Sequence, residues 1–154
     1  MRVALHVVLP LVLGVLVYVA WRTTDVELVT WLPESSVRAL RGSIGRMPLP
    51  AAVLGSAPDA AWGWAFGAAL ALVWRGRPLR AKRWWLGGGA IVAAYAEIGQ
   101  LWGVPPGSFD VIDLAAIVLG YALGAAIASR SGQEPGLGDP GGGGRRARAV
   151  VPER

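Results

Sequence analysis

The stretch Tyr95–Gly124 reads YAEIGQLWGVPPGSFDVIDLAAIVLGYALG, and it carries four polar side chains beside a turn rich in proline and glycine. Glu97 and Gln100 precede the turn, and Asp110 and Asp113 follow it. On each side the chain continues into an apolar run long enough to cross a bilayer. Carboxylates are costly in such places, so these side chains mark a candidate functional site.

The composition indicates a membrane protein. Of the 154 residues, 54% are hydrophobic, only 16% are charged and eight are tryptophan, which is unlike an ordinary soluble domain. The formal net charge is +5, but the basic residues stand in short groups without a nucleic-acid-binding motif, so no nucleic-acid partner is expected. The chain has no cysteine and a single histidine, His6, which argues against thiolate or histidine metal sites and a histidine triad. No cofactor is expected.

Four apolar runs predict an all-α fold, a polytopic integral membrane four-helix bundle over residues 1–130. The expected spans cover about residues 3–21, 58–75, 84–102 and 110–129. A cleaved signal peptide is the competing interpretation of the first run, which is longer than a usual signal sequence. The second run is short, so either its helix starts earlier with Pro58 as a kink, or Arg75 and Arg77 snorkel at its end.

Two segments outside the spans are also predicted. Pro33–Ser36 followed by Val37, Leu40 and Ile44 favours a short amphipathic helix on the membrane surface, in the first extracytoplasmic loop. An irregular solvated connection is the alternative. Residues 131–154 are rich in glycine, proline and arginine and have almost nothing to bury, which predicts a disordered cytoplasmic tail.

The distribution of basic residues predicts the orientation. Five of the nine residues in Arg75–Arg83 are basic, whereas the connection between the third and fourth spans has none. This bias places both termini in the cytoplasm. The arginines of the first connection argue against this orientation, because it places them outside the cytoplasm. Acidic residues of the same connection partly balance their charge.

With this topology, five polar residues from three spans fall in the outer leaflet: Asp59, Glu97, Gln100, Asp110 and Asp113. Each acid shares a helical stripe with small residues, and such faces are where membrane helices approach closely. We therefore predict one connected polar site that faces the bundle interior. The helix-packing residues are expected to be two glycine pairs at four-residue spacing: Gly63, Gly67, Gly120 and Gly124.

A purely structural interpretation stands beside this one. Asp110 is suited to cap the fourth span, and Asp113 and Asp59 are suited to complement helix dipoles. Glu97 is not explained in this way, because a negative charge is unfavourable at the C-terminal end of a helix. Several carboxylates in a low dielectric also need protonation or a counter-charge, and the candidate partners are the first-loop arginines Arg38, Arg41 and Arg46.

These motifs resemble the VanZ-like family, small polytopic membrane proteins of bacteria associated with low-level resistance to the glycopeptide teicoplanin. The resemblance rests on Asp59, Glu97-x-x-Gln100, Phe109-Asp110-x-x-Asp113 and Gly120-x-x-x-Gly124, and it extends over about residues 58–128. The family commonly has a histidine and an aromatic pair near Gly63 and Gly67, an arginine at Gly107 and an asparagine at Ile117, so this chain looks like a divergent member. The resemblance implies a multi-pass protein of the bacterial plasma membrane.

Two classes of function follow. In the first, the protein acts on cell-envelope properties and its acidic outer-leaflet site binds an envelope amphiphile, a lipid-linked ligand or a cation, with a link to teicoplanin resistance. In the second, it is an integral-membrane enzyme acting on a lipid-linked substrate, with Glu97 as general base and an Asp pair holding a hard cation. The sequence shows no nucleophile constellation, which favours the first class. Its partners are then the lipid bilayer and the ligand, and homo-oligomerisation stays open.

Overall fold

The computed structural model describes residues 1–21, 29, 31–104 and 108–131, and within these ranges the chain is helical with no β-strand. The all-α prediction is confirmed for this part of the chain. The predicted tail from residue 132 onward and the centre of the Pro/Gly turn, residues 105–107, lie outside the described residues. In chain order the elements are a π-helical turn η1 (Ala4–Val8), α1 (Leu9–Trp21), α3 (Glu34–Ser43), α4 (Ala51–Val73), α5 (Leu79–Gly99), a 3-10 turn η2 (Gln100–Trp102) and α6 (Val111–Arg130).

The two middle helices begin earlier than the apolar runs suggested. The extended backbone of Pro50 (ψ 139°) precedes α4, which starts at Ala51 and contains Pro58 in its interior. Of the two alternatives for this span, the earlier start is therefore the correct one. The extended backbone of Pro78 (ψ 136°) likewise precedes α5 at Leu79, so the basic residues that follow belong to the first turns of that helix.

α1 runs antiparallel to α4. Val7 packs against the buried cluster that includes Ala68 of α4. Gly14, about two turns after Val7 and within α1, lies against Ala61 of α4. A Cβ added to Gly14 would stand 3.1 Å from the Ala61 Cβ. Residue numbers thus rise on α1 while they fall on α4.

α4 and α6 run parallel and pack backbone to backbone through four glycines. A Cβ on Gly63 or Gly67 would overlap the carbonyl oxygen of Ile117 or Tyr121 and stand 3.1 Å from that residue's Cα. On α6, Gly120 and Gly124 face Ala60 and Trp64 of α4 in the same way. Small residues at four-residue spacing are what allows membrane helices to approach this closely. The structure thus places the four predicted packing glycines in one helix contact.

α5 runs antiparallel to α6 and is joined to it by polar contacts. The Tyr121 hydroxyl donates a 2.7 Å hydrogen bond to the Leu86 carbonyl, and Tyr121 packs edge-on against Phe66 of α4. Gly89 makes room for the phenol, since a Cβ there would stand 2.5 Å from the Tyr121 hydroxyl. The sequence interpretation did not identify Tyr121, whose partner lies 35 residues away.

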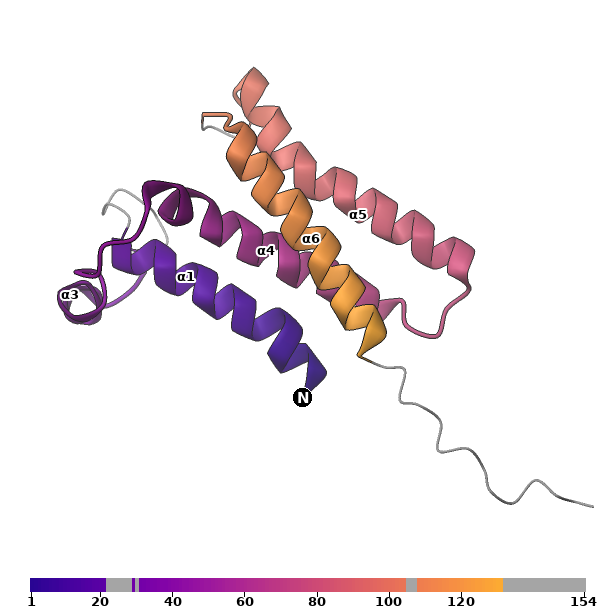
Figure 1. Ribbon diagram of the computed structural model, residues 1–154, viewed down its shortest axis with the longest axis horizontal. Helices are drawn as coiled ribbons and strands as arrows, with labels where there is room; N and C mark the ends of the chain where they lie inside the picture. Colours follow the sequence, from indigo (N-terminus) through magenta and orange to yellow (C-terminus); the bar gives the residue numbers. More distant parts are fainter. Residues whose placement is uncertain (22–28, 30, 105–107, 132–154) are drawn as a thin grey trace, which may run out of the picture.

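The alternating directions give the molecule two ends of opposite charge. Figure 1 shows the start of the chain, the α4–α5 connection and the end of α6 on the same side. We call this side the basic end; its basic residues are Arg2, Arg75, Arg77, Arg80, Lys82, Arg83 and Arg130. The opposite side is the acidic end; the acidic residues of α4, α5 and the start of α6 lie there, Asp59, Glu97, Asp110 and Asp113. α3, beside the end of α1, adds Glu34 together with Arg38 and Arg41.

Cationic side chains bind helix C-termini at both ends. At the basic end, Arg75 Nη2 donates a 2.8 Å bond to the Ala128 carbonyl of α6, and Lys82 Nζ donates a 2.9 Å bond to Ser129 Oγ. Arg75 therefore binds the end of α6 rather than snorkelling from α4. On the other side, Arg41 Nε donates a 3.0 Å bond to the Val19 carbonyl near the end of α1. The two arginine bonds satisfy carbonyls of the last helical turns, which have no N–H partner within their own helix.

The predicted amphipathic helix is present as α3. Its Val37 side chain is buried with Val19 and Val29, and Leu40 packs against this cluster. Its outer face carries an exposed ion pair between Glu34 and Arg38 at 3.7 Å. α3 is short, and the burial of its apolar face against the end of α1 stabilises it.

The large apolar side chains lie mainly on the outside. Ala68, Ala93 and Ala128 are fully buried, whereas no large side chain among the described residues is fully buried. Two helices, Ala4–Trp21 and Val111–Arg130, are long and apolar enough to cross a membrane, and only 22% and 28% of the respective windows are buried. A core helix of a soluble protein would bury most of its apolar face, so this distribution indicates membrane association.

The helices do not close into a symmetric four-helix bundle. α4 contacts α1, α5 and α6, and α5 also packs on α6, whereas α1 packs mainly on α4 and α3. α1 and α6 therefore flank α4 (Figure 1). Residues of η1, α1, α4 and α6 line an open groove. The helices are arranged around α4 with α1 at the edge, and they do not form the regular four-helix bundle that the sequence predicted.

Candidate functional site

Glu97 connects the end of α5 to the beginning of α6. Its side chain is only 8% exposed. Oε1 accepts a 2.9 Å bond from the Asp110 backbone N–H, and Oε2 accepts a 2.9 Å bond from Gln100 Nε2. A carboxylate at the end of α5 is unfavourable for that helix, but here it also faces the positive N-terminus of α6. The predicted residues Glu97, Gln100 and Asp110 thus form one hydrogen-bonded group.

Asp110 is the N-cap of α6. Its backbone is extended, and its Oδ1 accepts a 2.7 Å bond from the Ile112 N–H. Such a bond satisfies one of the amides that a helix N-terminus leaves without a partner. The capping interpretation of Asp110 is therefore correct, and its exposed side chain has a structural role.

Asp113 lies in the first turn of α6 and is half-buried against α4. Its Oδ1 is 3.9 Å from the position that a Cβ on Gly55 would take. Gly63 and Ile117 touch across the parallel α4–α6 contact, and one turn earlier on the two helices lie Asp59 and Asp113. The two aspartates therefore stand at the same level of the molecule.

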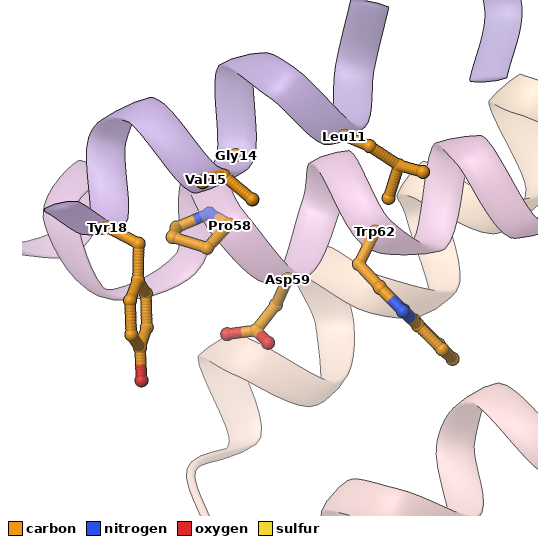
Figure 2. A pocket seen from close by; sticks show the side chains of 7 residues that line it. All are labelled: Leu11, Gly14, Val15, Tyr18, Pro58, Asp59 and Trp62. Carbon is orange, nitrogen blue, oxygen red and sulfur yellow. The ribbon is translucent and has the colours of Figure 1, made fainter. Parts of the chain in front are cut away.

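Asp59 is half-buried in the third turn of α4. Because α4 begins at Ala51, Asp59 is not in the first turn, and the helix-dipole interpretation does not apply to it. It lines a groove of about 230 Å³ between α1 and α4. Figure 2 shows its carboxylate between the side chains of Tyr18, from α1, and Trp62, from α4, which point to the same side.

The rest of this groove is apolar. Leu11 and Val15 of α1 line it together with Pro58. The groove exists because Gly14 brings α1 close to α4 at the level of Pro58. Tyr18 and Trp62 were not predicted as site residues. The signal that could have found Tyr18 is the Gly14-x-x-x-Tyr18 spacing, which puts a small residue and a polar aromatic on one face of the first span.

Two of the three predicted counter-charges, Arg38 and Arg41, have a partner outside the acidic residues of α4, α5 and α6. Arg38 forms its ion pair with Glu34 on α3, and Arg41 binds the end of α1. Within the described residues, no three histidine, cysteine or acidic side chains lie close enough together to hold a metal ion. The acidic end thus divides into a bonded group around Glu97, the Asp113 position beside α4, and Asp59 in the α1–α4 groove.

Comparison with known proteins identifies no relative. No family model matches the chain, and no curated protein or solved structure matches it either.

Proposed function

We propose that this protein is a four-span VanZ-like protein of the bacterial plasma membrane whose acidic end binds the cationic headgroup of an envelope amphiphile. The binding site is the α1–α4 groove around Asp59. The proposal takes both termini to be cytoplasmic and the acidic end to lie in the outer leaflet. Glu97, Gln100 and Asp110 fix the α5–α6 connection at the same end of the molecule.

The lengths of the middle helices support four spans. With 23 residues in α4 and 21 in α5, they extend about 34 Å and 31 Å at 1.5 Å per residue, enough for a bilayer core of about 30 Å. The charged first turns of α5 then reach the headgroup region by snorkelling. Their position at the same end as the chain start and the end of α6 supports a cytoplasmic basic end.

The observation that carries the binding proposal is the surrounding of Asp59. A carboxylate between a tyrosine and a tryptophan combines an anion with two aromatic rings, and this combination binds ammonium groups through charge and cation–π attraction. Leu11 and Val15 provide an apolar surface for an alkyl chain next to it. An alkylammonium amphiphile matches this groove, because its ammonium group suits Asp59 and its alkyl chain suits the apolar surface. Envelope lipids with amino headgroups have this chemistry.

Binding of dodecylammonium to the protein in nanodiscs tests the proposal. Asp59→Asn keeps the shape and removes the charge, so we expect about tenfold weaker binding, the factor that corresponds to a charge-assisted hydrogen bond of about 1.4 kcal/mol. Trp62→Leu removes one ring and should weaken binding about threefold, at about 0.6 kcal/mol. Glu34→Gln is the matched control, because Glu34 is an exposed acid on α3.

The outcomes separate clearly. Binding that depends on Asp59 and Trp62 but not on Glu34 supports the site. Equal binding by the wild type and Asp59→Asn contradicts it. The link to the envelope is checked in cells that express the protein: Asp59→Asn is expected to reverse any change in teicoplanin sensitivity that the wild type causes, and a full effect from the variant would separate that phenotype from the groove.

A further inference from the structure

A second groove lies on the other side of α1, between α1, α4 and α6. Its volume is about 620 Å³, within the range of about 300–1,000 Å³ found for ligand sites. Leu9, Leu119 and Leu123 line it, together with alanines of α4 and α6. It is separate from the Asp59 groove, and it opens between helices that the proposed function places in the bilayer.

Two polar groups lie in this apolar groove without a partner in the described part of the chain. His6 is 8% exposed and lines the groove, and it forms no hydrogen bond with another described residue. Trp64 also lines it, and its Nε1–H is buried and unpaired within the described residues. An indole N–H can only donate, and an unpaired buried donor costs about 1–3 kcal/mol. Both groups therefore favour a ligand that brings an acceptor oxygen into the groove.

Two cationic residues lie beyond the residues that line the groove, toward the basic end. Arg2 lies one helical turn, about 5 Å, before His6, and Arg130 ends α6 beyond Leu123. Both arginines are exposed. A ligand that lies along the groove with its polar head toward this end would therefore meet positive charge first and the N–H donors of His6 and Trp64 deeper inside.

We propose that this groove binds an acyl chain of an anionic phospholipid. The phosphate lies at Arg2 and Arg130, an ester carbonyl accepts hydrogen bonds from His6 and Trp64, and the chain extends past Leu9 and Leu119. Anionic lipid is the occupant that complements both the charge toward the basic end and the donors inside. The inference rests on the membrane insertion that the proposed function includes, but not on ligand binding at Asp59.

Native mass spectrometry of the purified protein, equilibrated with equal amounts of phosphatidylglycerol and phosphatidylcholine of the same chain length, measures the selectivity. We expect one retained phosphatidylglycerol per wild-type protein. Ala116→Trp fills the groove, which Ala116 lines, and should abolish this retention. Ala115→Trp is the matched control, because Ala115 is the neighbouring residue on α6, is exposed and does not line the groove.

A second variant tests the polar contact without changing the bulk of the groove. His6→Leu is expected to lower phosphatidylglycerol retention about fivefold, the factor for one hydrogen bond of about 1 kcal/mol. Equal retention of the two lipids by the wild type would show an ordinary lipid annulus and overturn the proposal. Equal losses in Ala115→Trp and Ala116→Trp, or unchanged retention in His6→Leu, would also overturn it. Ammonium binding at Asp59 is expected to survive all three substitutions, which keeps the two proposals distinguishable.

Discussion

Replacing Gly124 with leucine is expected to separate α4 from α6 and to destabilise the protein more than any other single change considered. A Cβ at Gly124 would stand 2.9 Å from the Trp64 Cα and overlap the Trp64 carbonyl oxygen. The obstacle is helix backbone, which cannot rotate away as a side chain can. Overpacking costs about 1–3 kcal/mol where side chains can adjust, so we expect at least the upper part of that range here.

The control is Gly88→Leu on α5. Gly88 lies within a helix, and a Cβ added to it meets no atom within 4 Å. Because glycine is unfavourable in a helix interior by about 0.5–1 kcal/mol relative to alanine, this change should be neutral or stabilising. The fraction of protein that stays monodisperse in mild detergent on heating compares the two variants. Equal melting temperatures for both would mean that α4 and α6 do not meet at Gly124.

The second large effect concerns Glu97. Both of its carboxylate oxygens accept hydrogen bonds, one from the Asp110 N–H and one from Gln100. Glu97→Gln replaces one acceptor by a donor, so that one of these two donors loses its partner. For a side chain that is 8% exposed, the expected cost is about 1–3 kcal/mol.

An exchange of the two side chains provides the sharpest control. When Glu97→Gln is combined with Gln100→Glu, the amide carbonyl introduced at position 97 can accept from the Asp110 N–H, while its NH₂ group donates to the carboxylate introduced at position 100. The double variant should therefore recover most of the thermal stability that Glu97→Gln loses, which is a non-additive result. If the two substitutions simply add, Glu97 does not act through these bonds.

Local patterns in the sequence were sufficient for some features and not for others. The spacing of Gly63 with Gly67 and of Gly120 with Gly124 lies within single helices, so the packing face could be predicted from sequence alone. The capping role of Asp110 and the short helix after Pro33 are local in the same sense. By contrast, the starts of α4 and α5 were placed late, because apolar runs mark the part of a helix in the bilayer core and not the turns that follow Pro50 and Pro78.

Features that depend on contacts between distant segments could not be predicted. Arg75 binds the Ala128 carbonyl, 53 residues away, whereas the pattern around Arg75 indicated a topology signal or a snorkelling side chain. The grooves on the two sides of α1 follow from the position of that helix at the edge of α4, which hydropathy does not determine. Asp59 was expected to share one site with Glu97, and its groove with Tyr18 and Trp62 was not predicted.

The arrangement in the membrane is the central claim, and cysteine labelling tests it most directly. The chain has no cysteine, so single substitutions give an unambiguous signal without further engineering. Arg77→Cys reports on the α4–α5 connection and Ser108→Cys on the segment just before α6, and both residues are exposed. In intact cells treated with a membrane-impermeant maleimide, we expect labelling of Ser108→Cys, and labelling of Arg77→Cys only after lysis. Labelling of Arg77→Cys in intact cells, or equal accessibility of the two positions, would contradict the account.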